Sequence, residues 1–153
     1  MPLSKFAHLL YPSDTSFLPV LGNQAYDVQV FDCTGNLIDR IEITRPHDGH
    51  ANAIDAKLVI ETGLGAARTC DFGGQMAPLT PWIIDIAKRK SIKDYSDCTL
   101  VLVAASDPPF DMELPVFEKH CERVVDELKK ITFRAKRTFL SVPALDKCFR
   151  IED

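Results

Sequence analysis

A continuous run of apolar residues in the second half of the chain most constrains its fold. Residues 99–105 read Thr-Leu-Val-Leu-Val-Ala-Ala, and Pro108 and Pro109 follow them. A run of this kind, ended by prolines, is typical of a central strand that is covered on both faces. Helices on both sides of a sheet supply that cover. The run therefore predicts an α/β fold.

An earlier pattern predicts a β-hairpin. Residues 26–32 and 37–44 are rich in β-forming side chains, and residues 34–36, Thr-Gly-Asn, have the chemistry of a turn. Because side chains alternate along a strand, Val28 and Val30 share one face of the first strand. The two segments are therefore expected to pair in antiparallel fashion across the turn.

Apolar residues at helical spacing predict three helices, at residues 50–62, 80–93 and 112–130. Thr80 is placed to cap the second helix, with Pro81 at its first helical position. The third helix is strongly amphipathic. Its predicted buried stripe consists of Phe117, Cys121, Val124, Val125 and Leu128.

The remaining segments complete the predicted domain. Residues 138–142 are expected to form a last strand, 147–151 a short edge segment and 95–97 a loop. Prolines interrupt residues 1–23, which are expected to form an irregular N-terminal lead-in with a short helical turn. The order of elements implies a three-layer α/β/α sandwich with a small mixed sheet. A length of 153 residues suits one domain spanning 1–153.

Charge and cysteine content narrow the functional classes. The formal net charge is −4, which disfavours a dedicated basic clamp for nucleic acid but leaves room for local basic clusters. The five cysteines form no Cys-x-x-Cys pair, so a thiolate zinc cluster has no support. The N-terminus does not resemble a secretory signal, and no apolar run approaches the length of a membrane helix. The expectation is a cytoplasmic protein with free thiols and no membrane contact.

The most informative chemical pattern is a pair of carboxylates on the hairpin. Asp27 lies near the start of the first strand, and Glu42 lies on the second strand, two positions before Thr44. Carboxylates from adjacent strands can converge on one hard cation, and Mg²⁺ prefers oxygen ligands. Such a cation activates water and neutralises charge on a phosphodiester. Asp27 and Glu42 are therefore candidate Mg²⁺ ligands.

The hairpin resembles the PD-(D/E)xK nuclease superfamily, in which an Asp on one strand precedes a Glu-x-Lys on the next. The succession after the hairpin is similar as well: a helix with a basic end, a buried strand, a long amphipathic helix and a final strand. The resemblance implies a restriction-endonuclease-like fold and metal-dependent hydrolysis, with Asp27 and Glu42 as metal ligands. Thr44 occupies the lysine position and cannot supply a positive charge. Lys57, on the following predicted helix, is the expected substitute, and a catalytically inactive relative is the other interpretation.

Other interpretations of the same residues remain open. Asp27 and Glu42 also fit a solvent-facing hairpin, with Glu42 paired to Arg40 or Arg45. His50 follows closely on the hairpin and could assist as a general base or a phosphate contact. The segment around it, residues 45–50, fits equally well a polar turn whose Asp48 caps the next helix.

Two basic clusters complete the list of candidates. Residues 88–90 and Lys93 lie at the end of the second predicted helix, and Arg134, Lys136 and Arg137 lie near the last strand. Either cluster could follow a phosphate backbone, and either could be a solvated end of its element. The two clusters would support the nuclease interpretation if they lay on the same side of the domain as Glu42.

The leading hypothesis from sequence is a divergent nuclease-like domain. It would hydrolyse phosphodiester bonds of DNA or RNA with Mg²⁺, through Asp27 and Glu42 and with Lys57 or His50 assisting, or it would bind nucleic acid as a degenerate relative. The alternative is a non-enzymatic interaction or structural domain, such as a homodimer. Two ligands of one metal must lie within a few ångströms of each other, so geometry separates these hypotheses.

Overall fold

The structure is a computed structural model that describes residues 2–22, 24–45, 57, 60–61, 72–104 and 113–151. Within these residues the chain has an α/β fold with a six-stranded mixed sheet and three helices. None of the described helices is long and apolar enough to cross a membrane.

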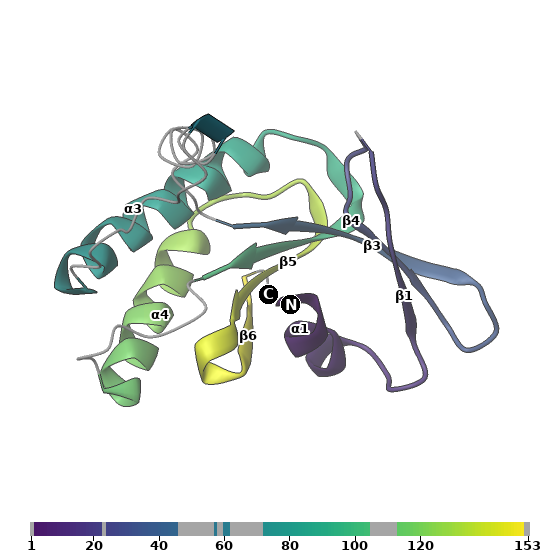
Figure 1. Ribbon diagram of the computed structural model, residues 1–153, viewed down its shortest axis with the longest axis horizontal. Coiled ribbons are helices and arrows are strands. Elements are labelled where there is room, and N and C mark those ends of the chain that lie inside the picture. Colours follow the sequence, from purple (N-terminus) through teal and green to yellow (C-terminus); the bar gives the residue numbers. More distant parts are fainter. Residues whose placement is uncertain are drawn as a thin grey trace.

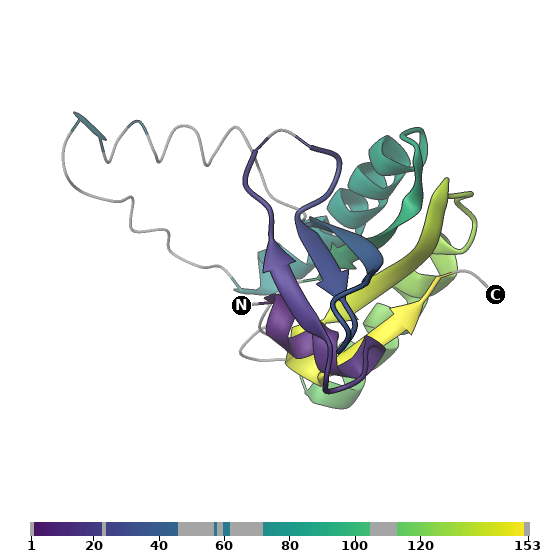
Figure 2. The same ribbon diagram turned by 90° about the vertical axis from the view of Figure 1, so that its right-hand side faces the viewer.

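The strands lie in the sheet in the order in which they occur along the chain, so β1 and β6 form its edges (Figure 2). Strands β1 to β3 pair antiparallel, β3, β4 and β5 run parallel, and β6 returns antiparallel. The strands are β1 (Ser16–Pro19), β2 (Val28–Phe31), β3 (Leu37–Thr44), β4 (Tyr95–Val103), β5 (Ala135–Val142) and β6 (Lys147–Arg150). A short 3-10 turn, η1 (Pro143–Leu145), joins the last two strands.

Two of the helices belong to crossovers between parallel strands, because such strands cannot be joined by a tight turn. Helix α3 (Phe72–Ser91) lies between β3 and β4, and α4 (Leu114–Leu128) lies between β4 and β5. The N-terminal helix α1 (Pro2–Leu10) contacts β6 and η1. Figure 1 shows α3 and α4 together on one side of the sheet and α1 near β6, away from them.

Strand β4 divides the core into two clusters. Leu100 and Leu102 pack with α3 and α4, whereas Val101 and Val103 pack with Phe6 of α1 and with β2 and β3. All four β4 side chains are buried, because alternate residues of a strand point to opposite faces. The apolar run thus forms a central strand with a helix-covered core on each face, as its composition predicts.

Several predictions are confirmed. The hairpin forms between β2 and β3, and β3 has the predicted bounds, residues 37–44. The edge segment predicted at 147–151 forms β6. The five residues predicted to form the buried stripe of the third helix are the buried residues of α4: Phe117, Cys121, Val124, Val125 and Leu128.

The prediction for residues 1–23 is wrong for much of that segment, which contains α1 and β1. Phe6 and Tyr11 are buried against the sheet, and β1 pairs with β2 over its four residues. Tertiary burial therefore orders a segment whose prolines suggest a coil. Pro12 lies just after α1, and Pro19 ends the edge strand β1, which are both positions that tolerate proline.

The loop predicted at residues 95–97 is also wrong, because β4 begins at Tyr95. The tyrosine is only 3% exposed, and its N–H donates a hydrogen bond to the carbonyl of Arg134, 2.7 Å away. Polar residues follow Tyr95, so the apolar pattern alone predicts a strand that begins only at residue 99. Strand β5 likewise begins three residues before the predicted residue 138, at Ala135.

Helix α3 begins at Phe72, eight residues before the predicted cap Thr80. Thr80 lies inside the helix, and its hydroxyl bonds to His120 of α4 instead of capping an N-terminus. Pro81 is accommodated within the helix. The predicted apolar stripe of this helix is nevertheless correct, since Ile83, Ile86 and Ala87 are all buried. The helix predicted at 50–62 lies mostly outside the described residues.

Candidate functional site

Glu42 and Lys90 form an ion pair between the middle of the sheet and the last turn of α3. The two side chains are 13% and 20% exposed, so the pair is largely shielded from water. Lys90 Nζ also donates a hydrogen bond to Tyr95 Oη, 3.3 Å away, and lies 5.7 Å from the centre of that ring. Glu42 is therefore not a solvent-facing residue, and Arg40 pairs with Asp97 at 2.7 Å.

The environment of Lys90 fixes its charge. Burial by itself lowers the pKa of this ammonium, but the hydrogen bonds to Glu42 and Tyr95 and the negative charge of Glu42 outweigh it. The net effect raises the pKa of Lys90 above its usual value of 10.5. Lys90 consequently remains a cation at neutral pH, so it can stabilise negative charge but cannot accept a proton.

Asp27 lies just before β2, not on a strand as predicted, and it lies against the same stretch of β3. Its N–H donates to the carbonyl of Ile41 at 2.8 Å, and its carboxylate Oδ2 accepts a hydrogen bond from the N–H of Ile43 at 2.8 Å. These two contacts fall on the neighbours of Glu42 on either side. The structure thus brings both predicted carboxylate residues to one short segment of β3, with Asp27 exposed and Glu42 shielded.

Asp27 and Glu42 fit a Mg²⁺ site only if water and substrate oxygens supply the remaining ligands. Among the described residues, no three His, Cys, Asp or Glu side chains gather as they would around an ion. Mg²⁺, however, is usually held by one or two carboxylates together with waters and substrate phosphates. Within the described part of the chain, the contacts above engage Asp27 Oδ2 and Glu42 Oε1. Each carboxylate keeps its other oxygen for a cation.

A pocket of about 440 Å³ opens beside this segment, between the end of β3 and the last turn of α3. We call it the β3–α3 pocket. Arg89, Lys90 and Lys93 of the first basic cluster therefore lie on the same side as Glu42, so the condition set for the two clusters is met for one of them. The pocket is lined by Ile43, Thr44, Arg45, Ile86, Arg89, Lys90 and Lys93.

Thr44, the residue at the lysine position of the predicted motif, lines this pocket. It is 8% exposed, and its hydroxyl has no hydrogen-bond partner within the described ranges. An unpaired buried hydroxyl costs free energy, of the order of 1–3 kcal/mol. Buried polar groups without a partner are few in native proteins.

The other two predicted catalytic residues are Lys57 and His50, and only Lys57 is described. Lys57 is exposed in a helical segment, and its Nζ lies 3.7 Å from Glu61 Oε1. His50 lies outside the described residues, as does Asp48. The lysine that contacts Glu42 is Lys90.

Sequence reasoning placed Lys90 in a basic helix end and did not single it out. A usable signal was present. Lys90 follows Ile83, Ile86 and Ala87 at spacings of seven, four and three residues, so it continues their buried stripe. A lysine on the buried stripe of a helix requires a partner, which here is Glu42.

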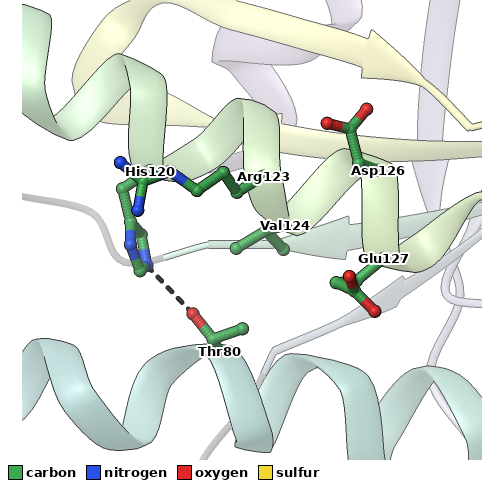
Figure 3. A pocket seen from close by; sticks show the side chains of 6 residues that line it. All are labelled: Thr80, His120, Arg123, Val124, Asp126 and Glu127. Carbon is green, nitrogen blue, oxygen red and sulfur yellow. Dashed lines mark hydrogen bonds between the residues drawn. The ribbon is translucent and has the colours of Figure 1, made fainter.

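A second pocket, of about 290 Å³, lies between α3 and α4 and has a different chemistry. Figure 3 shows Thr80 of α3 facing His120 of α4, with their Oγ1 and Nε2 atoms 2.9 Å apart. Burial, together with the nearby charge of Arg123, lowers the pKa of His120, so the imidazole is neutral. Asp126 points away from the pair in Figure 3. Among the described residues, no carboxylate bonds to His120, so within them the pair lacks the third member of a nucleophilic triad.

A buried carboxylate, Asp39, organises the other face of β3, and sequence reasoning missed it. Tyr11 Oη and Thr99 Oγ1 each donate to its Oδ2 at 2.7 Å, and Arg137 pairs with the same oxygen. Lys136 Nζ lies 3.3 Å from Oδ1. These contacts engage both carboxylate oxygens, so the network links the residue that follows α1 with β3, β4 and β5 as a structural unit.

The residues of the second basic cluster form ion pairs with carboxylates of the fold. Arg134 pairs with Asp94 at 3.4 Å, and Lys136 and Arg137 pair with Asp39. The guanidinium of Arg137 also lies over the rings of Tyr11 and Phe139. This cluster therefore serves the fold, which leaves the β3–α3 pocket as the basic surface beside Glu42.

No protein-family model, no curated protein and no solved structure matches the chain. The functional assignment therefore depends on the geometry of the site itself.

Proposed function

We propose that the chain is a divergent nuclease-like domain of the PD-(D/E)xK superfamily with a restriction-endonuclease-like α/β/α fold. It would hydrolyse phosphodiester bonds of DNA or RNA with Mg²⁺. The observation that supports this proposal is the ion pair between Lys90 and Glu42, formed beside Asp27. That pair supplies, from another element, the cation that Thr44 cannot provide.

The succession of elements also favours the proposal. The hairpin of β2 and β3 is followed by α3 with its basic end, the buried strand β4, the amphipathic helix α4 and the strand β5. This is the order on which the resemblance rests. Because β3 and β4 are adjacent and parallel, the last turn of α3 returns to β3, where Lys90 contacts Glu42.

Each residue has a role that its geometry permits. Asp27 and Glu42 would hold the cation, which supplies a polarised water and neutralises phosphate charge when it is bound. The ammonium of Lys90 is fixed by Glu42 and Tyr95, so its charge is in place before substrate binds. A preorganised cation of this kind stabilises the negative charge that develops on a phosphate in the transition state. The raised pKa of Lys90 excludes it as a general base.

Hydrolysis of labelled single- and double-stranded DNA and RNA, with Mg²⁺ or Mn²⁺ and with a chelator, tests the proposal. We expect metal-dependent cleavage of at least one of these substrates. Asp27→Asn, Glu42→Gln and Lys90→Met should each lower the rate by about a hundredfold or more, since each removes a ligand or a charge from the reacting phosphate. Lys88→Met is the matched control, because Lys88 is an exposed lysine on the same turn of α3.

The outcomes separate the branches of the proposal. Cleavage that survives Glu42→Gln would come from a contaminant and would count against the assignment. Binding of nucleic acid without cleavage by the wild type would refute hydrolysis and leave a degenerate nucleic-acid-binding relative. If the wild type neither binds nor cleaves any of the four substrates, the proposal fails, and the interaction-domain alternative replaces it.

A further inference from the structure

A partly exposed aromatic ring lies beside the proposed site of hydrolysis. Tyr26 immediately precedes Asp27, in the segment that joins β1 to β2. Two contacts hold the ring in place. The guanidinium of Arg40 lies over it, with Cζ 5.4 Å from the ring centre, and Gln29 Nε2 donates a hydrogen bond to Tyr26 Oη at 3.3 Å. The proposed hydrolysis uses neither the ring nor these two partners.

The ring lies on an open part of the sheet. Leu18, Gln29 and Arg40 are cross-strand neighbours on β1, β2 and β3, so their side chains form a row on one face. Leu18 is 54% exposed, and the side chain of Arg40 is 32% exposed. In Figure 1 the hairpin extends beyond α3 and α4. We call this row, together with Tyr26, the hairpin shelf.

The hairpin shelf shares its face of the sheet with Glu42. Arg40 and Glu42 lie two positions apart on β3, so their side chains point to the same face. Two residues of a strand span about 7 Å. One nucleotide can bridge a gap of this size. A nucleic acid strand whose phosphate lies at Asp27 and Glu42 can therefore place a neighbouring base on the shelf.

The chemistry of the shelf fits a nucleobase. Every base has a flat π face that stacks on an aromatic side chain, whatever the sequence. Tyr26 is only partly buried, so its two partners leave part of the ring open to a ligand. Arg40 is itself held by Asp97, at 2.7 Å. Because these contacts hold the ring before a ligand arrives, little rotamer freedom remains to be lost on binding.

We propose that Tyr26 stacks an unpaired nucleobase next to the phosphate at Asp27 and Glu42. This inference rests on the proposed function and narrows its substrate to single-stranded nucleic acid. In a duplex each base is paired and stacked between its neighbours, so the ring reaches a base only where the strand is unpaired. Tyr26 is then a specificity-determining residue that contacts the substrate away from the reacting atoms.

Equilibrium binding in chelator tests the inference without any hydrolysis. Three end-labelled probes of equal length, made both as DNA and as RNA, are compared by fluorescence anisotropy: a mixed-sequence single strand, a strand whose bases are all replaced by abasic residues, and a duplex. The wild type should bind the single strand about tenfold more tightly than the abasic strand, as expected for one stacked base. Both strands should lose affinity similarly as salt is raised, because their phosphates are the same.

Substitutions of one aromatic residue identify the shelf. Tyr26→Leu removes the ring and keeps an apolar side chain, so it should reduce the advantage of the base-bearing strand to about twofold or less. Tyr26→Phe keeps the ring and should keep most of the advantage. Trp82→Leu is the matched control, because Trp82 is an exposed aromatic residue of α3, about two turns before Lys90. It should keep the full advantage. Thermal melts confirm that the variants fold.

Equal binding of the base-bearing and abasic strands, or binding of neither, would overturn the inference. An advantage that survives Tyr26→Leu, or that Trp82→Leu abolishes, would do the same. If Tyr26→Leu weakens duplex binding equally, the ring does not require an unpaired base. A mononucleotide that competes as well as the strand would assign the shelf to a free nucleotide and refute the assignment to strands.

Failure of this inference is distinguishable from failure of the proposed function. A base advantage that depends on Tyr26, in a chain that cleaves no nucleic acid, would refute hydrolysis and support the shelf. Metal-dependent cleavage by a chain without that advantage would support the proposed function and refute the shelf.

Discussion

Lys90 and Glu42 lie 48 positions apart in the sequence, and their side chains form a shielded ion pair between α3 and β3. The pair fixes a positive charge beside the hairpin at which sequence analysis places a metal site. It also explains why a lysine can occupy the buried stripe of α3. The proposed function and the packing of α3 therefore involve the same contact, and its removal should affect both.

The Lys90–Glu42 pair should contribute measurably to stability. Lys90→Met leaves Glu42 shielded without its cation and should lower the free energy of unfolding by about 1–3 kcal/mol. The double variant Lys90→Met/Glu42→Gln should lose less than the sum of the two single losses, by about 1–2 kcal/mol. Urea unfolding of the wild type and the three variants measures this coupling. Additive losses would show that the two side chains do not interact in solution.

Two buried threonines on neighbouring strands should respond in opposite ways to the same substitution. The hydroxyl of Thr44 has no partner among the described residues, so Thr44→Val should leave the stability unchanged or raise it by about 1 kcal/mol. Thr99 donates to Asp39 and accepts from Arg137 Nε, so Thr99→Val should cost about 1.5–3 kcal/mol. Thermal and urea unfolding of the two variants, side by side, measure the difference. A comparable loss for Thr44→Val would mean that its hydroxyl is already satisfied in the free protein.

Asp39 should make the protein sensitive to acid. Burial raises the pKa of this carboxyl, but hydrogen bonds from Thr99, Tyr11 and Arg137 outweigh burial and lower the pKa below the usual 3.8. Because the folded pKa is below the unfolded one, the stabilisation is complete above about pH 4 and is lost as pH falls through the folded pKa. Asp39→Asn should cost about 3 kcal/mol at neutral pH, since it leaves Arg137 without its partner.

The pH dependence isolates this effect from that of other carboxyls. The hydrogen bond from the Thr34 side chain and those from Asn36 lower the pKa of Asp32 to about 2, and this exposed group adds its own acid sensitivity. That contribution is the same in the wild type and in Asp39→Asn. Urea unfolding at neutral pH and at about pH 3 should therefore show a smaller loss for the variant than for the wild type. Equal losses would contradict an ionised Asp39 in the folded state.

Local patterns predicted the elements whose residues carry a consistent period. The alternation in residues 37–44 gave β3 with its observed bounds, and the amphipathic stripe of α4 was predicted residue by residue. The apolar run of β4 predicted cover on both faces, which Leu100 and Val101 confirm by packing into separate clusters. In each case burial on defined faces selects the side chains directly, so the sequence records it.

The errors occur where burial depends on partners that are distant in the sequence. Tyr95 is a strand residue because it pairs with the β5 side of the sheet, and Thr80 is a helix-interior residue whose hydroxyl meets α4. The polar residues after Tyr95 have the local pattern of a loop. The proline after Thr80 has the local pattern of a helix start. Propensity is a weak signal, and tertiary contacts override it.

The sequence by itself determined the hairpin, the central strand and the placing of Glu42 on β3, because these follow from alternation within a few residues. Only the tertiary structure decided which cation meets Glu42. The α3 crossover between β3 and β4 returns the chain so that Lys90, not Lys57, contacts Glu42. The same packing buries the hydroxyl of Thr44 and surrounds its pocket with basic groups. Such pairings depend on the distance between elements in space, which no local pattern of residues specifies.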